Sequence, residues 1–180
     1  MEIKKIKARL DAIPQPCRTC LYWEAPGEYQ NDNGDEEAVL KKQEWFSKTL
    51  DEFGNCAFLA YDHGDVIGYA QYAPVDRFLN IAKYPAASTL YDANTEEETI
   101  FLSCLFIPNE ENRGKGVGSA LLNKIIENLR SRGYDLLVTF ARRKNPNNPS
   151  GSLEFLKKNG FKIEEDHPTY PLLSLDLTER

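Results

Sequence analysis

One stretch of the chain, Thr99–Gly133, constrains the fold more than any other. Thr99–Ile107 is a nearly unbroken apolar run, typical of a strand covered on both faces of a sheet. Pro108 ends this strand because proline has no amide hydrogen to donate. Apolar residues then recur on one face of a helix that Gly133 stops: Val117, Leu121, Leu122, Ile125, Ile126 and Leu129. The stretch therefore predicts a buried strand followed by an amphipathic helix.

The turn between these two elements is rich in glycine. It reads Arg113-Gly114-Lys115-Gly116-Val117-Gly118. Glycines remove side chains where a ligand approaches the backbone, and the start of a helix offers free amides and the positive end of its dipole. The pattern favours an anion site, most often for phosphate, with Arg113 and Lys115 adding positive charge. The alternative is a tight strand-to-helix turn without a ligand.

Length and composition limit the classes of function. A chain of 180 residues fits one domain, residues 1–180, in which residues 1–34 supply an N-terminal strand and a cysteine segment. A net charge of −6 and a pI near 5.1 disfavour nucleic acid as a partner. No run approaches the ~20 apolar residues of a membrane span, and the start lacks the apolar core of a signal peptide. We expect a cytoplasmic monomer or homodimer that does not contact a membrane.

The four cysteines leave more than one interpretation open. Cys56 and Cys104 lie in apolar runs and are expected to be buried. Cys17 and Cys20 form a C-x-x-C pair, but no second pair and only two isolated histidines accompany them, so no metal site is predicted. The pair also does not open a helix, as redox motifs of this kind do. A structural role is favoured, and a redox or metal protein stays an alternative.

The remaining segments predict an α/β fold. In chain order, they are an edge strand over Lys4–Leu10, a helix capped by Asp35 with the core stripe Val39, Phe46, Leu50 and Phe53, a hairpin of Cys56–Tyr61 and Val66–Tyr72, an irregular stretch over residues 74–98, a buried strand Asp135–Ala141, a short helix Ser152–Asn159, and two strands, Phe161–Glu165 and Leu172–Leu177. This order is a mixed α/β arrangement.

Two blocks of the sequence resemble a known family. Arg113–Gly118 fits the pattern R/Q-x-x-G-x-G/A on a strand, loop and helix, which resembles the acyl-CoA signature of the GNAT superfamily of N-acetyltransferases. The second block, SLEFLKKNGFKI, is similar to that family's short helix ending in Gly-Phe. The resemblance runs from about Asp35 to Leu177, although the path from Ile107 to Arg113 looks one residue longer than is usual. It implies a central mixed sheet of about six to seven strands flanked by about four helices.

The resemblance also implies an activity and a set of binding residues. The chain would be an acetyl-CoA-dependent N-acetyltransferase acting on a primary amine of a small molecule or peptide. Acetyl-CoA would lie where the strands Thr99–Ile107 and Asp135–Ala141 separate. The implied cofactor-binding residues are Leu105, Phe106 and Ile107 along the pantetheine, Arg113, Gly114, Lys115, Gly116, Val117, Gly118 and Ser119 at the pyrophosphate, and Asn147, Asn148, Ser150 and Phe155 along the pantetheine arm.

Catalytic residues are harder to assign. A protonated amine needs a general base before it attacks the thioester. The strand Thr99–Ile107 carries no inward carboxylate, so Glu98 at its start is the candidate base. The tyrosine that often serves as general acid in this family would fall at Leu156, which cannot donate a proton. Tyr170 is therefore the candidate acid, with Tyr134 or a water as alternatives. A non-catalytic acyl-CoA-binding or sensing module is therefore a second hypothesis.

Overall fold

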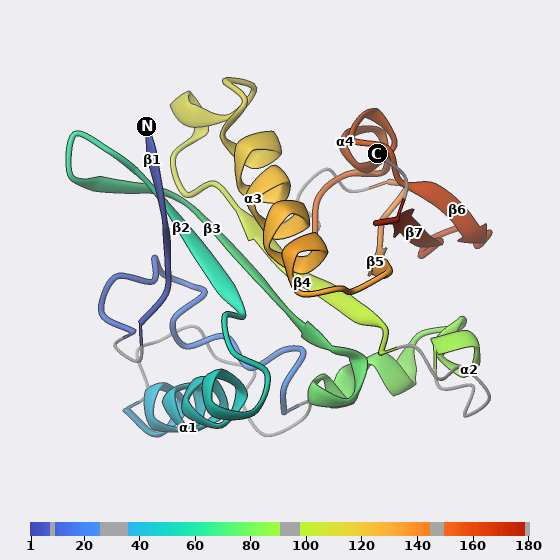
Figure 1. Ribbon diagram of the computed structural model, residues 1–180, viewed down its shortest axis with the longest axis horizontal. Helices are drawn as coiled ribbons and strands as arrows, with labels where there is room; N and C mark the ends of the chain where they lie inside the picture. Colours follow the sequence, from blue (N-terminus) through green and yellow to red (C-terminus); the bar gives the residue numbers. More distant parts are fainter. Residues whose placement is uncertain (8–9, 26–35, 91–97, 145–149, 179–180) are drawn as a thin grey trace.

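The computed structural model describes residues 1–7, 10–25, 36–90, 98–144 and 150–178 (Figure 1). Within these ranges its helices and strands are β1 (Glu2–Lys5), α1 (Glu36–Glu52), β2 (Ala57–Asp62), β3 (Asp65–Pro74), α2 (Ala87–Leu90), β4 (Ile100–Phe106), α3 (Val117–Ser131), β5 (Leu136–Phe140), α4 (Leu153–Lys158), β6 (Lys162–Glu165) and β7 (Leu172–Asp176). Short 3₁₀ turns occupy Val75–Arg77, Leu79–Lys83 and Glu110–Asn112. The predicted mixed α/β arrangement is confirmed.

One seven-stranded sheet runs through the molecule in the order β1-β2-β3-β4-β5-β7-β6. Every neighbouring pair is antiparallel except β4 and β5. These two parallel strands pair only at Ile100 with Leu137 and at Phe101 with Val138, although β4 continues to Phe106. The two strands therefore part after Phe101, as the resemblance implied, and leave a wedge in the middle of the sheet.

A bulge in β4 lies where this wedge begins. On β3, Gln71 pairs with Cys104 and the next residue, Tyr72, pairs with Leu102, so Ser103 is the extra residue. The Ser103 hydroxyl donates a hydrogen bond of 3.1 Å to the Gln71 carbonyl, which holds the bulge against β3. The bulge bends β4 at the point where β5 leaves it.

The two faces of the sheet are covered by different elements. Helix α3 lies across β2, β3 and β4, and Tyr72 on that face donates a hydrogen bond of 2.7 Å to the Asn128 side chain (Figure 1). Gly68 permits this close packing, because a Cβ there would meet Leu121 and Val117 at 2.9 Å. Segment 10–25 and α1 lie on the opposite face, where Trp23 and Phe101 pack edge to face. The core therefore has two layers, one on each side of the sheet.

Two predicted elements differ from the observed ones. The first strand spans Glu2–Lys5 rather than Lys4–Leu10, because its four rungs with β2 end at Lys5. The predicted core stripe of α1 is wrong in part. The buried residues of α1 are Ala38, Lys42, Phe46 and Thr49, while Val39 and Leu50 are only partly buried. The helix is turned this way because Lys42 pairs with a buried carboxylate beneath it. The predicted hairpin of β2 and β3 is confirmed.

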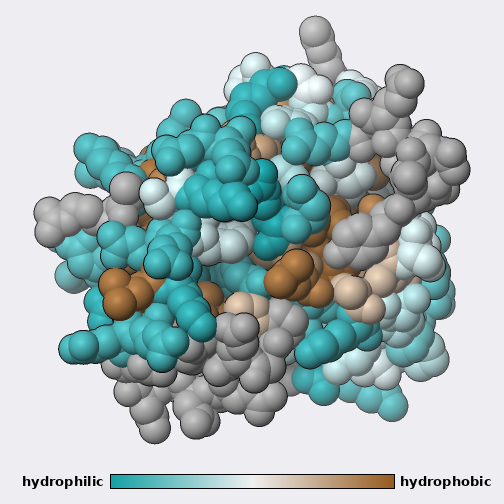
Figure 2. Space-filling view, turned by 90° about the horizontal axis from the view of Figure 1, so that it is seen from below, coloured by the Kyte–Doolittle hydropathy of each residue, from teal (hydrophilic) through white to brown (hydrophobic). Residues whose placement is uncertain are grey.

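Seen from below the view of Figure 1, the surface is largely hydrophilic, with separate apolar patches (Figure 2). The large apolar side chains exposed among the described residues are scattered: Met1, Tyr22, Leu40, Leu79 and Ile163. None of the described helices is long and apolar enough to cross a membrane.

Candidate functional site

A pocket of about 520 Å³ lies at the end of β4, where the glycine-rich turn meets the starts of α3 and α4. Its lining residues are Leu105, Phe106, Ile107, Asn112, Arg113, Gly114, Gly116, Gly118, Ser119, Gly151, Ser152, Phe155 and Lys158. The structure thus brings together most of the residues that the resemblance implied for acyl-CoA binding, from two blocks about 35 residues apart. The remaining assigned residues lie elsewhere or outside the described ranges.

Two glycines give the turn its shape. Gly114 has φ +73° and Gly116 has φ +86°, values that residues with a Cβ rarely adopt. A Cβ built on either glycine would meet no protein atom within 4 Å. Packing therefore does not explain the missing side chains. The turn leaves open space over its backbone, into which a ligand can approach.

The N-terminus of α3 supplies hydrogen-bond donors to this space. Gly116 is the N-cap residue of α3, and no side chain caps the helix. The first intrahelical bond runs from the Ala120 amide to the Gly116 carbonyl, at 3.0 Å. The amides of Val117, Gly118 and Ser119 precede that bond and have no acceptor within the helix. These amides and the helix dipole favour an anion at the pocket.

Gly118 has a different role, because it allows α3 to pack closely against β4 and α4. A Cβ there would lie 3.2 Å from the Leu105 side chain and 3.3 Å from the Phe155 ring. Helix α3 can therefore begin directly beside β4 and α4. Val117, by contrast, is 4% exposed and packs toward Gly68, so only its backbone can serve the pocket.

The cations around the pocket are placed differently from the prediction. The Arg113 guanidinium donates to the Ile107 carbonyl at 3.3 Å and pairs with Glu110 at 3.3 Å, so it ties the loop to the end of β4. Lys115 is exposed and does not line the pocket. Lys158 does line it, and the sequence reasoning missed this residue. Lys158 follows Phe155 by three residues on a helix, so both lie on one face. This spacing could have predicted that Lys158 lines the pocket.

Polar side chains bridge to β4 at the narrow end of the wedge. The Thr139 hydroxyl of β5 donates a hydrogen bond of 2.8 Å to the Leu102 carbonyl of β4. Ser150 is fully buried, and its hydroxyl donates to the Ser103 carbonyl at 3.5 Å. Ser150 therefore supports the bulge and does not line the pocket. Asn147 and Asn148, also assigned to the pantetheine arm, lie outside the described residues.

The two candidate catalytic residues lie at opposite ends of the sheet. Glu98 is exposed just before β4. Burial raises the pKa of the neighbouring Tyr134, Arg132 opposes this effect, and the Glu98 carboxylate adds to it. Glu98 lies seven residues before Leu105, about 23 Å along an extended chain. Tyr170 packs 5.2 Å from the Tyr84 ring, under the guanidinium of Arg142, which follows β5. The structure brings Tyr170 to the end where the strands part and does not bring Glu98 there. Leu156 is fully buried.

A buried polar network lies on the other face of the sheet, below the bulge. Glu24 forms a short ion pair with Lys42 and accepts a hydrogen bond of 2.6 Å from Gln71. Gln71 also accepts a hydrogen bond from the Tyr69 hydroxyl, at 2.5 Å. Burial alone lowers the pKa of Lys42, but the Glu24 carboxylate outweighs this effect and the pKa lies above its ordinary value. The network fixes segment 10–25 and α1 against β3.

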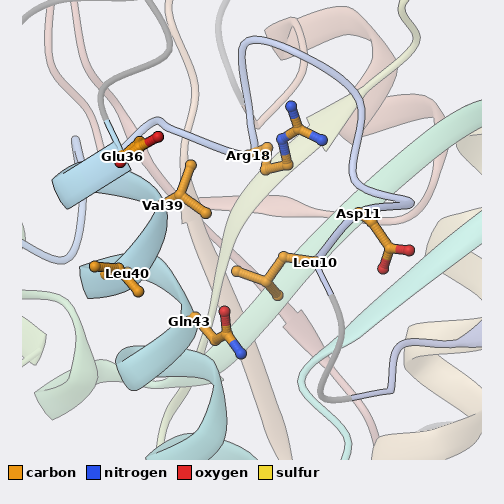
Figure 3. Close-up of a pocket in the computed structure, with 7 residues that line it drawn as sticks. All are labelled: Leu10, Asp11, Arg18, Glu36, Val39, Leu40 and Gln43. Carbon is orange, nitrogen blue, oxygen red and sulfur yellow. The ribbon is translucent and has the colours of Figure 1, made fainter.

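A second large pocket, of about 570 Å³, lies between α1 and segment 10–25 (Figure 3). Val39 and Gln43 of α1 face Leu10 across it, and its rim carries Arg18 as well as the carboxylates Asp11 and Glu36. The pocket has charges of both signs, and the first turn of α1 that borders it carries the carboxylates of Glu36 and Glu37, which occupy the positive end of the helix dipole and disfavour a further anion. The first turn of α3 carries no acidic residue, so the pocket at α3 is the better anion site.

Comparisons with known proteins agree with this geometry. The model of the acetyltransferase (GNAT) family matches residues 18–161. Comparison with curated protein sequences gave no match. Among solved structures, an N-acetyltransferase from Staphylococcus aureus Mu50 is 21% identical with a TM-score of 0.61, and 98% of each chain is covered. The PaiA N-acetyltransferase from Thermoplasma acidophilum, in complex with coenzyme A, is 17% identical with a TM-score of 0.56, covering 97% of this chain and 98% of that one.

A third solved structure, yncA from Salmonella typhimurium with its cofactor acetyl-CoA, is 18% identical with a TM-score of 0.64. The match covers all of this chain and 95% of the yncA chain. At these identities the likeness concerns the fold alone. The family model, in contrast, matches most of the chain, including the glycine-rich turn and the start of α4. The protein belongs to the GNAT family of acetyltransferases.

Proposed function

We propose that this protein binds acetyl-CoA at the pocket beside α3 and transfers the acetyl group to a primary amine of a small molecule or peptide. The observation that carries the proposal is the uncapped N-terminus of α3 over two glycines with open space above them. Coenzyme A carries a pyrophosphate, which is the kind of anion that such a helix start binds. The bound acetyl-CoA and coenzyme A in two of the structurally similar proteins support the proposal.

The chain's own residues would divide the work as follows. The amides of Gly118 and Ser119 would hold the pyrophosphate, with Lys158 as a nearby cation. The free edge of β4 at Leu105 and Phe106 would hydrogen-bond along the pantetheine. A backbone amide of this edge would stabilise the oxyanion that forms when the amine attacks the thioester carbonyl.

Proton transfer is proposed to involve Tyr170 and a base that faces the wedge. Tyr170 is the candidate acid for the departing thiolate because it lies at the end of β5. Glu98 lies about a strand's length from Leu105 at the wedge. We therefore expect Glu98→Gln to leave the pH profile of kcat unchanged. Tyr170→Phe should lower kcat by about tenfold or more with little change in KM for acetyl-CoA. An unchanged kcat in Tyr170→Phe would remove that residue from the proposal.

A pair of glycine variants tests acetyl-CoA binding. Gly116→Ala adds a Cβ over the proposed pyrophosphate site, at φ +86°. Gly133→Ala is the matched control, because Gly133 also has positive φ (+80°) and open space but lies beyond the other end of α3. Both should lose about 1 kcal/mol of stability. Only Gly116→Ala should weaken acetyl-CoA binding, by about tenfold or more, in isothermal titration calorimetry.

Two other outcomes would redirect the proposal. If the folded wild-type protein gives no binding heat with acetyl-CoA or coenzyme A, the acyl-CoA site is wrong. If it binds both but releases no thiol with any amine in a panel of polyamines, aminoglycosides, amino acids and peptides, the protein is an acyl-CoA-binding module without catalysis.

A further inference from the structure

Three of the four cysteines meet at one small cavity on the sheet face opposite α3. The cavity has a volume of about 40 Å³ and is lined by Cys17, Cys20, Tyr22, Trp23, Glu24, Lys42, Tyr69, Gln71 and Cys104. Cys17 and Cys20 come from segment 10–25, whereas Cys104 is the residue after the bulge in β4. The cluster therefore joins the C-x-x-C pair to the strand that borders the wedge.

The closest pair of thiols is not the one that the sequence pattern suggested. The sulfurs of Cys17 and Cys104 lie 3.9 Å apart in a thiol hydrogen bond, although 87 residues separate them in the chain. No corresponding contact joins Cys17 to Cys20 among the described residues. A disulfide needs about 2.0 Å between the sulfurs, so a shift of about 2 Å in side chains already in contact would suffice.

The surroundings favour reaction at Cys17. Its hydrogen bond with Cys104 lowers the pKa of the Cys17 thiol, burial opposes this effect, and the cationic Lys42 reinforces it. The same hydrogen bond raises the pKa of Cys104, so one member of the pair is the better thiolate and the other remains a thiol. Cys20 is exposed and lines the same cavity as the buried Cys17 and the partly buried Cys104, which gives a small neutral molecule a route to the pair. An attacking thiolate, a resolving thiol and access are the requirements of a thiol oxidation site.

We propose that Cys17 and Cys104 are a peroxide-sensitive pair that forms a reversible disulfide. The Cys17 thiolate attacks one oxygen of hydrogen peroxide, giving a sulfenic acid and hydroxide. The sulfur of Cys104 then displaces water from the sulfenic acid and forms the S–S bond. Two thiols lose two electrons and two protons in total, and the peroxide is reduced to two waters. A dithiol such as thioredoxin or dithiothreitol reverses the step by exchange.

The disulfide would join segment 10–25 to β4 beside the bulge. Because Cys104 directly follows the extra residue Ser103, the bond would restrain β4 where it leaves β5. We expect oxidation to lower the rate of acetyl transfer, since the thioester carbonyl would lie near this point. This expectation rests on the proposed function. Formation of the bond itself does not depend on that function and is measured without activity.

Peptide mapping tests the pairing. The reduced protein is treated with stoichiometric hydrogen peroxide, and free thiols are alkylated in denaturant before digestion and mass spectrometry. We expect a Cys17–Cys104 peptide and a fall from four alkylatable thiols to two, both reversed by dithiothreitol. Cys17→Ser and Cys104→Ser should each abolish the linked peptide. Cys56→Ala is the matched control, because Cys56 is buried away from the cavity and should leave the linkage intact.

Specific results would overturn the proposal. A Cys17–Cys20 linkage in wild type, or retention of all four thiols, contradicts it. Should Cys104→Ser fail to fold, Cys104→Ala and the Cys20→Ser variant decide the matter, because Cys20→Ser should still form the bond. Loss of activity on oxidation without the linked peptide would place the sensitive group elsewhere. The linked peptide in a protein that does not bind acetyl-CoA would preserve the disulfide and reject only the proposed function.

Discussion

At the scale of single residues, the buried pair of Lys42 and Glu24 carries a large cost of desolvation. Their side chains are 4% and 3% exposed, so both charges have left water. Lys42 also donates a hydrogen bond of 2.9 Å to the Cys20 carbonyl, and Glu24 accepts one from Gln71. Such a pair is stable only while both partners are present, because either charge alone would be buried without compensation.

Removing one partner should therefore cost much more than removing both. We expect Lys42→Met to lower the free energy of unfolding by about 3–5 kcal/mol, as measured by urea denaturation. The double variant Lys42→Met/Glu24→Gln should recover part of this loss. Lys124→Met, which breaks an exposed pair with Glu127, is the control and should change stability by less than about 1 kcal/mol. Equal losses in the two single lysine variants would contradict the buried pair.

Residues differed in how far the sequence could predict them. Gly114 and Gly116 were predictable because their role depends on backbone conformation, which is local. Lys42 was not, since a lysine on an amphipathic helix normally faces water and its partner lies 18 residues earlier. Tyr84, which stacks 4.4 Å from Phe140, likewise depends on a contact that no local pattern encodes.

At the scale of elements, the parting of β4 from β5 creates the candidate site. Strand β4 and helix α3 were predicted to within about a residue, because an apolar run and a 3.6-residue period are strong local signals. The bulge at Ser103 was not predicted, as it follows from the register between β3 and β4. The same holds for β1, whose extent is set by its rungs with β2.

The Thr139 hydroxyl should matter more than its size suggests. Thr139→Val keeps the shape of the side chain but removes the hydrogen bond to the Leu102 carbonyl inside the sheet. We expect a loss of about 1–3 kcal/mol in unfolding free energy, since a buried carbonyl loses its partner. Chemical denaturation measures it, and Thr178→Val, at an exposed position just beyond β7, is the control. A neutral Thr139→Val variant would show that the wedge does not depend on this bond.

At the scale of the whole molecule, several buried acidic groups make stability sensitive to alkaline pH. Burial raises the pKa of Cys56 to about 12, from 9.0, and raises the pKa values of Tyr69, Tyr72 and Tyr84 as well. Above pH 9 the unfolded chain loses protons that the folded protein keeps. The unfolded state then binds fewer protons, so stability falls as pH rises. Cys17, whose pKa is lowered, acts in the opposite sense.

We therefore expect the free energy of unfolding to fall between pH 9 and pH 11 under reducing conditions. Cys56 alone should contribute about 1.4 kcal/mol per pH unit once its unfolded thiol is ionised. Urea denaturation at pH 8, 9, 10 and 11 measures the slope. Cys56→Ala should make this slope shallower by about 1.4 kcal/mol per pH unit, which corresponds to one proton. This holds whatever the effect of the substitution on stability at pH 8. An unchanged slope in that variant would mean that the Cys56 thiol ionises in the folded protein.

The separation of β4 from β5 also gives the sheet an edge in its interior. Beyond Phe101 the side of β4 that faces β5 has no strand partner among the described residues, although β3 pairs along its other side as far as Phe106, apart from the bulge at Ser103. Unpaired strand edges are where separate chains add to one another and begin to aggregate. A ligand that hydrogen-bonds along Leu105 and Phe106 would cover this edge as a neighbouring strand does. The protein's resistance to self-association would then depend on the concentration of its ligand.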